Sequence, residues 1–276
     1  MKRKDATLIK EVDSFHSIVP YVMPKRTEAE VSFTDVFDVT ALKKYMDKRN
    51  KKKDVNIKIF HAICTAVAKV IYLRPKLNIF IAGRKFWQRN DITLSFVVKQ
   101  KFEDEAEEAL MFLKVQEDMN IDKISDIILG KVERVRKDGT NSLDKTMDFV
   151  GKLPRPILNV LFFVIRRLEY HGIMPRALQK GDPNYSTCLL SNLGSIGCDS
   201  CNHHLNDYGT NSFMMTIGEM KQDEATGKWK IQITVNLDER IADGFYFAKS
   251  LKLMRFLLSN PKYLEEKISD PVPYEV

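Results

Sequence analysis

The string Asp238-Glu239-Arg240-Ile241-Ala242-Asp243-Gly244 lies between an apolar stretch, Ile231 to Leu237, and a segment with helical periodicity, Phe245 to Leu258. A short apolar run of this kind predicts a buried strand, and apolar residues at helical spacing predict an amphipathic helix. The polar string therefore marks a turn from strand to helix. Gly244 suits the close backbone bend that such a turn requires.

The rest of the chain predicts an α/β fold with a mixed β-sheet packed with helices. Residues Val31 to Val39 alternate between apolar and polar, which is typical of a half-buried strand. Asn56 to Leu73 places apolar residues at three- and four-residue intervals, which predicts a helix that stops at Arg74-Pro75. Further strands are expected at Leu77 to Ala82, Ile92 to Lys99, Leu110 to Val115 and Phe213 to Gly218, and further helices at Thr40 to Arg49 and Ile121 to Val135.

Three other strings accompany the turn at 238–244. They are Leu189-Leu190-Ser191-Asn192-Leu193-Gly194-Ser195-Ile196-Gly197, Phe37-Asp38-Val39-Thr40-Ala41-Leu42 and Arg74-Pro75-Lys76-Leu77-Asn78. Together these strings resemble the chloramphenicol acetyltransferase-like superfamily, and most closely the catalytic domain of 2-oxoacid dehydrogenase dihydrolipoamide acyltransferases. The family's turn reads Asp-His-Arg-x-x-Asp-Gly, so Glu239 stands here in the place of the motif histidine.

The resemblance covers roughly Ser14 to Val98 and Tyr185 to Leu264, and it implies a trimer with active sites between subunits. In this family the histidine takes the proton from a thiol, and the resulting thiolate attacks the acyl carbonyl. The resemblance therefore implies acyl-coenzyme A as a co-substrate, with a small-molecule or lipoyl acceptor that offers a thiol, hydroxyl or amine. Neither the acceptor, the acyl length nor activity toward chloramphenicol follows from it.

The same resemblance assigns roles to individual residues. Ser191 matches the serine that stabilises the tetrahedral intermediate, although a serine before Gly194 also suits a simple turn. Arg240 and Asp243 match ion-paired residues that hold the base strand and fix the turn. Catalytic roles thus fall on Ser191, Glu239, Arg240 and Asp243.

Glu239 leaves three interpretations open. A free glutamate carboxyl has a pKa of about 4.3, so only burial would bring it toward the value that suits a general base for a thiol. The chain is then an acyltransferase with altered catalysis, or a catalytically silent trimeric binding or assembly module. The third interpretation is that the motif likeness is accidental.

The string Cys198-Asp199-Ser200-Cys201-Asn202-His203-His204 follows Ser191 closely. It offers four potential zinc ligands, but a structural zinc site normally needs a second, distant ligand pair, and none is evident. We therefore predict no metal. Either His203 or His204 is a candidate for the missing base, and the alternative is that both are ordinary loop residues.

Composition bounds the remaining possibilities. The chain has 276 residues, a formal net charge of +7 and four cysteines without repeated spacing, which favours one domain in a reducing compartment. Acidic residues interrupt any apolar signal segment near the N-terminus, so a cytoplasmic location is expected. We assign residues 1–13 to a tail and 14–276 to the acyltransferase-like domain, with no lipoyl domain in this chain.

A basic run occupies the end of the helix predicted at Thr40 to Arg49 and the loop that follows it. Its members are Lys43, Lys44, Lys48, Arg49, Lys51, Lys52 and Lys53. A solvated loop accounts for such a run, and attraction for a coenzyme A phosphate or a membrane surface is the alternative. No nucleic-acid partner is predicted, because no aromatic residue interleaves the lysines.

The segment Pro154 to Leu168 departs from the family. It is nearly all apolar from Ile157 to Ile165 and is flanked by basic residues. About 20 residues are needed to span a bilayer, so this segment is too short for a transmembrane helix. A buried core or subunit-interface helix and a helix lying at a membrane interface are the two predictions. The role of the surrounding region, 101–184, is not indicated.

Overall fold

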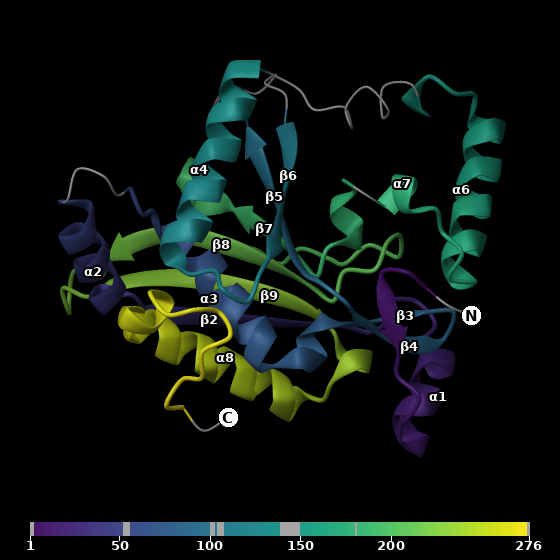
Figure 1. Cartoon of the computed structure of the whole chain (residues 1–276), viewed down its shortest axis with the longest axis horizontal. Coiled ribbons are helices and arrows are strands. Elements are labelled where there is room, and N and C mark those ends of the chain that lie inside the picture. Colours follow the sequence, from purple (N-terminus) through teal and green to yellow (C-terminus); the bar gives the residue numbers. More distant parts are fainter. Residues whose placement is uncertain are drawn as a thin grey trace.

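The computed structural model describes residues 3–51, 56–99, 103, 108–138, 150–179 and 181–274. Lys52 and Lys53 of the basic run lie outside these ranges. Within the described residues the strands form a larger and a smaller sheet (Figure 1).

The larger sheet is mixed, as the sequence predicted. Its strands lie in the order β2-β9-β8-β7-β5-β6, and β7 runs parallel to both of its neighbours while the other pairs are antiparallel. Every strand that the sequence predicted in this sheet is confirmed to within a few residues, whereas the strand at Cys188–Asn192 was not predicted. The bounds are β2 (Glu30–Asp38), β5 (Ile92–Lys99), β6 (Glu108–Val115), β7 (Cys188–Asn192), β8 (Phe213–Gln222) and β9 (Trp229–Asp238).

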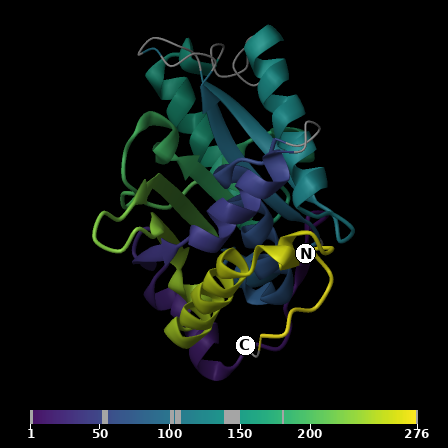
Figure 2. The same ribbon diagram turned by 90° about the vertical axis from the view of Figure 1, so that its left-hand side faces the viewer.

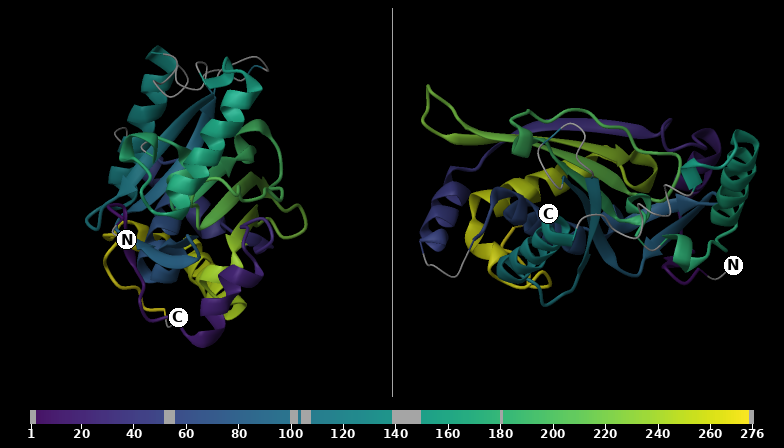
Figure 3. Two further views of the ribbon diagram at one scale, coloured as in Figure 1. Left: turned by 90° about the vertical axis from the view of Figure 1, so that its right-hand side faces the viewer. Right: turned by 90° about the horizontal axis from the view of Figure 1, so that it is seen from above.

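Helices cover one face of this sheet, and their buried residues form the core together with those of the strands. α3 (Ile59–Leu73) is buried from Phe60 to Ile71, and it packs against α8 (Gly244–Ser259) and α4 (Ile121–Asp138) (Figure 2). Burial on all sides explains why α3 is apolar nearly all round. Seen from above, α4 and α8 lie on the same side of β8 and β9 (Figure 3). α2 (Thr40–Asn50) packs against α8.

The smaller sheet corrects one sequence prediction. It has the order β1-β4-β3, with β1 (Ala6–Leu8), β3 (Ile79–Ala82) and β4 (Lys85–Arg89). No strand was predicted between Leu77–Ala82 and Ile92–Lys99, but β4 lies there, and β3 and β5 belong to different sheets. β4 is short and begins on an exposed lysine, which gives only a weak alternating pattern. β1 comes from the segment that the sequence analysis set apart as a tail.

A second correction concerns α6 (Arg155–Tyr170), which lies beside the smaller sheet at one end of the molecule (Figures 1 and 3). A buried core helix is wrong, because none of its residues is buried. Ile157, Val160 and Phe163 are 51%, 64% and 62% exposed. Apolar side chains this exposed are typical of a surface that contacts a partner or a membrane, so both interface interpretations stay open.

The remaining elements are short. Among the described residues, no helix combines the length and the apolar character needed to cross a membrane. The other helices are α1 (Ser14–Val22) and α7 (Arg176–Gln179), with 3-10 turns η1 (Pro75–Asn78), η2 (Pro183–Tyr185), η3 (Leu193–Ile196), η4 (Glu239–Ile241) and η5 (Pro261–Leu264).

Gly194 has a packing role in this fold. It is the second residue of η3, which follows β7 directly, and it lies against the backbone of β8. A Cβ atom at Gly194 would approach the carbonyl oxygen of Gly218 to 2.4 Å and the Cα of Glu219 to 2.9 Å. Rigid backbone cannot move aside as a flexible side chain can, so this glycine lets the turn after Ser191 close onto the sheet.

We predict that Gly194→Ala lowers the free energy of unfolding by about 1–3 kcal/mol, the usual cost of overpacking. Gly130→Ala is the matched control, because Gly130 is exposed within α4 and its Cβ would meet nothing within 4 Å. That change should stabilise the helix by ~0.5–1 kcal/mol. Guanidinium unfolding at one fixed protein concentration measures both, and equal effects of the two substitutions would refute the packing role.

Candidate active site

A buried ion pair holds the strand-to-helix turn. Asp238 ends β9 with its carboxylate buried, and both oxygens accept hydrogen bonds from the Arg240 side chain, each at 2.7 Å. A third guanidinium nitrogen of Arg240 donates to the carbonyl oxygen of Met23 at 2.9 Å. A two-point contact of this kind fixes direction as well as distance, so the turn has one orientation.

Asp243 has a different role from the one that the family resemblance suggests for an ion-paired residue. It is exposed, and its Oδ1 accepts the backbone N–H of Tyr246 at 2.7 Å. This is the N-cap of α8, an interaction typically worth ~1 kcal/mol. Arg240 thus pairs with Asp238, while Asp243 starts the helix.

Glu239 points away from this buried pair. Its backbone N–H donates to the carbonyl oxygen of Ala29 at 2.9 Å, but its side chain is exposed. Within one chain, Glu239 therefore lacks the burial that a carboxylate base for a thiol requires.

Ser191 lies on β7, next to Thr216 of β8. The residue is half-buried, and its hydroxyl makes no hydrogen bond within the described part of the chain. The hydroxyls of Ser195 and Thr216, in contrast, are engaged by Asn192 and Cys201. Ser191 is thus free to donate to a bound group, as an oxyanion donor must.

The sheet register keeps Ser191 and Glu239 apart within one chain. Ser191 is level with Thr216 on β8, whereas Asp238 is level with Ser212 through a backbone hydrogen bond. Glu239, one residue beyond Asp238, is therefore displaced from Ser191 by roughly 15 Å along the strands and by ~10 Å across two strand spacings. These two residues cannot act on the same reacting atom unless a second chain brings them together.

His203 and His204 lie on a loop that crosses the sheet. The backbone N–H of His203 donates to Asn236 at 3.2 Å, and Glu30 accepts from both Asn236 and the backbone of Leu205, at 2.7 and 2.6 Å. The loop is therefore anchored, but both imidazoles are exposed. No group of three or more His, Cys, Asp or Glu side chains within the described ranges is arranged to hold a metal ion.

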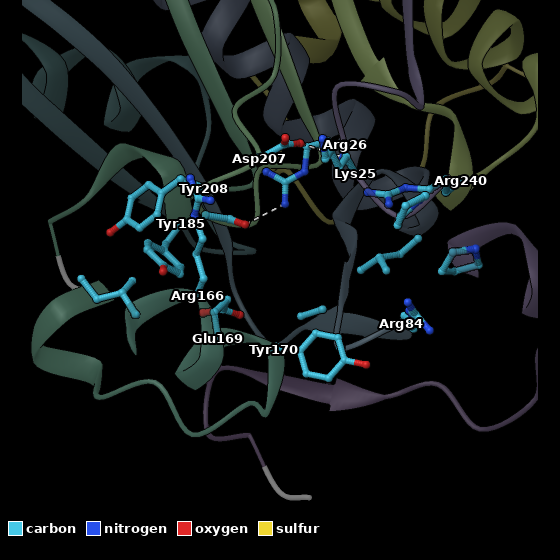
Figure 4. Close-up of a pocket in the computed structure, with 17 residues that line it drawn as sticks. Lys25, Arg26, Arg84, Arg166, Glu169, Tyr170, Tyr185, Asp207, Tyr208 and Arg240 are labelled. Carbon is cyan, nitrogen blue, oxygen red and sulfur yellow. Dashed lines mark hydrogen bonds between the residues drawn. The ribbon is translucent and has the colours of Figure 1, made fainter. Parts of the chain in front are cut away.

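The structure also contains a cleft of about 330 Å³, lined in part by Arg240, which the sequence did not indicate (Figure 4). Its basic lining residues are Lys25, Arg26, Arg84, Arg166 and Arg240, and its acidic ones are Glu169 and Asp207. Tyr170, Tyr185 and Tyr208 add aromatic surface. Burial raises the pKa of the Tyr185 and Tyr208 hydroxyls, so both are neutral. These residues come from segments far apart in the chain, and apart from Arg240 none belongs to a motif that points to a shared site.

Comparison with known proteins identifies the fold. No protein-family model matches the sequence, and no curated protein matches it. Solved structures do match. A catalytic core of the 2-oxoacid dehydrogenase multienzyme complex from Thermoplasma acidophilum has a TM-score of 0.60 at 14% identity, over 92% of this chain and 99% of that one.

Two further structures agree with this result. Dihydrolipoamide acetyltransferase from Azotobacter vinelandii, studied for the catalytic roles of a serine, a histidine and an asparagine, has a TM-score of 0.59 at 11% identity, over 93% of each chain. A chloramphenicol acetyltransferase has a TM-score of 0.57 at 11% identity, over 92% of this chain and 98% of that one. The chain therefore has the chloramphenicol acetyltransferase-like fold, which the catalytic domains of dihydrolipoamide acyltransferases share.

Proposed function

We propose that this protein is an acyltransferase that moves an acyl group between coenzyme A and a thiol, hydroxyl or amine acceptor. The observation that supports this proposal best is the uncommitted hydroxyl of Ser191, held beside the closely packed turn at Gly194. A rigidly placed donor without an internal partner is suited to a developing oxyanion. Acyl-coenzyme A is the co-substrate in this proposal, and no metal takes part.

The proposed site lies between subunits of a homotrimer. The separation of Ser191 from Glu239 within one chain favours a shared site, and so does the exposed apolar surface of α6. In this arrangement the Glu239 carboxylate of one subunit accepts the proton of the attacking thiol or hydroxyl. The new bond forms at the acyl carbon, and the Ser191 hydroxyl of the neighbouring subunit donates to the carbonyl oxygen as it gains charge. When the oxyanion collapses, the leaving thiolate regains a proton from Glu239.

The second candidate is a catalytically silent trimeric binding or assembly module. The exposure of Glu239 favours it, since a solvated carboxylate is a weak base toward a thiol. Both candidates need the same fold, so only turnover distinguishes them.

Replacement of the proposed oxyanion donor gives the first test. We expect Ser191→Ala to lower kcat about 10²- to 10³-fold, the usual effect of removing one such donor. Ser195→Ala is the matched control, because Ser195 is exposed and its hydroxyl bonds only to the carbonyl of Asn192. The assay follows release of free coenzyme A from acetyl-coenzyme A with dihydrolipoamide or small hydroxyl and amine acceptors. Equal activity of the two variants would remove Ser191 from the mechanism.

Substitution of the base position separates the two candidate functions. Glu239→Gln keeps the shape of the side chain but cannot accept the proton, so turnover should be lost. Glu239→His restores the base that the family resemblance implies and should preserve or raise activity. If the wild type is inactive toward every donor and acceptor while Glu239→His is active, the silent module is the better description. If His203→Ala or His204→Ala removes the activity instead, the base lies on the loop.

A mixing experiment tests the shared site. Ser191→Ala and Glu239→Gln are each expected to be inactive alone, but mixed trimers would contain some interfaces with both native residues. Random mixing restores about a quarter of the interfaces, by the closed cyclic symmetry of a trimer. Light scattering should give the mass of three chains. A monomer at micromolar concentration, or no recovery on mixing after unfolding and refolding together, would contradict the trimer mechanism.

A further inference from the structure

The cleft of Figure 4 is built where the β3–β4 hairpin meets the C-terminal end of α6. Ala82 pairs with Lys85, so Gly83 and Arg84 form a two-residue turn, with φ of 59° and 60°. A Cβ atom at Gly83 would approach the carbonyl oxygen of Tyr170 to 2.2 Å. The turn and the helix are therefore in close backbone contact, which fixes this wall of the cleft.

Arg84 is an unusual residue for its position in that turn. Among the described residues other than glycine, it alone has a positive φ. The left-handed region is unfavourable for a residue with a Cβ atom, and glycine would adopt it without cost. Such strain is often retained where a side chain has a function. The Arg84 guanidinium lies 4.7 Å from the centre of the Tyr21 ring and lines the cleft.

The two acidic side chains of the cleft are already engaged. Glu169 bonds to the buried Arg3 at 2.5 Å. Asp207 accepts the backbone N–H groups of Arg26 and Thr27 at 3.0 and 3.1 Å. Glu169 is thus paired with a cation outside the cleft lining, while the negative charge of Asp207 acts on Arg26, and neither acid bonds to Arg84 or Arg166.

The cationic side chains that line the cleft outnumber the carboxylates that pair with them. Arg84 and Arg166, which lie on opposite sides of the cleft in Figure 4, have no carboxylate partner within the described residues. Lys25 reaches only 4.0 Å from Glu28, at the protein surface. Three cations around one concave space repel one another, and a bound anion would relieve that repulsion.

Arg26, which also lines the cleft, has a buried donor without a hydrogen-bond partner. Only 5% of the Arg26 surface is exposed, yet its Nε makes no hydrogen bond. The nearest acid is Asp238 at 3.9 Å, and both of the Asp238 oxygens already accept from Arg240. A buried donor left without a partner is costly, and occupied binding sites commonly satisfy such groups.

The other walls are apolar and aromatic. Pro20, Pro24, Ile81 and Ile165 line the cleft together with Tyr170 and the edge-packed pair Tyr185 and Tyr208. A cleft of about 330 Å³ with a few convergent charges is of the size that holds a small organic molecule.

We propose that this cleft binds a small organic anion, with its carboxylate or phosphate held between Arg84 and Arg166 and its apolar body against the tyrosines. The site does not depend on the proposed acyl transfer, since it uses neither Ser191 nor Glu239. It is assigned to binding alone.

Calorimetry without any acyl donor tests the proposal. The probes are benzoate, phenyl phosphate and benzamide, the last being the neutral counterpart of benzoate. We expect at least one anion to bind at least ten-fold more tightly than benzamide, and to weaken as salt is raised, because the attraction is between charges. Comparison of benzoate with phenyl phosphate identifies which anionic group the site prefers. If neither anion binds better than benzamide, the proposal is wrong.

Substitution of Arg84, in the strained turn, tests the proposed anion contact directly. Arg84→Gly removes the cation and also removes the strain, so the melting temperature should be unchanged or higher while anion affinity falls about ten-fold. Arg84→Lys keeps the charge and should retain most of the affinity. Arg166→Gln tests the opposite wall, and Lys252→Gln, an exposed change on α8 outside the cleft, is the control for overall charge. Wild-type affinity in both Arg84→Gly and Arg166→Gln would overturn the assignment.

Discussion

The buried carboxylate of Asp238 is the constraint on which the functional region depends. Arg240 donates a hydrogen bond to each of its oxygens, and the Nε of Arg26 lies 3.9 Å from one of them. Arg26 and Arg240 in turn bond to the backbones of Gly209 and Met23. One charged group thereby ties the end of β9 to the segment after α1 and to the loop before β8. Removal of one partner from such a buried pair usually costs about 3–5 kcal/mol, because it leaves an unpaired buried charge.

This ion pair gives two residues that are adjacent in the sequence, Glu239 and Arg240, different surroundings. Glu239 turns outward, whereas its neighbour Arg240 lines the cleft. The same turn thus presents the proposed base on one side and a basic concave surface on the other. A strand-to-helix turn with a fixed ion pair allows this division, since consecutive residues there point in different directions.

The sheet imposes a second constraint. β7 and β9 flank β8, and their register sets Ser191 well away from Glu239. No side-chain rotation covers the separation of roughly 18 Å that ordinary strand dimensions give for these two residues. The fold itself thus prevents these two residues of one chain from acting together.

Local patterns in the sequence determined the strands of the larger sheet other than β7, and also α3, α8 and the turn at 238–244, because each depends on periodicity or on a short motif. The motif strings also identified the fold at an identity too low for overall similarity. Sequence did not reveal β4, whose pattern is short and polar, or the exposure of α6, whose apolar residues suit a core equally well. It also assigned Asp243 to an ion pair that belongs to Asp238. The burial of a charge, the register between strands and the cleft at Arg84 depend on segments distant in sequence, so only tertiary structure decided them.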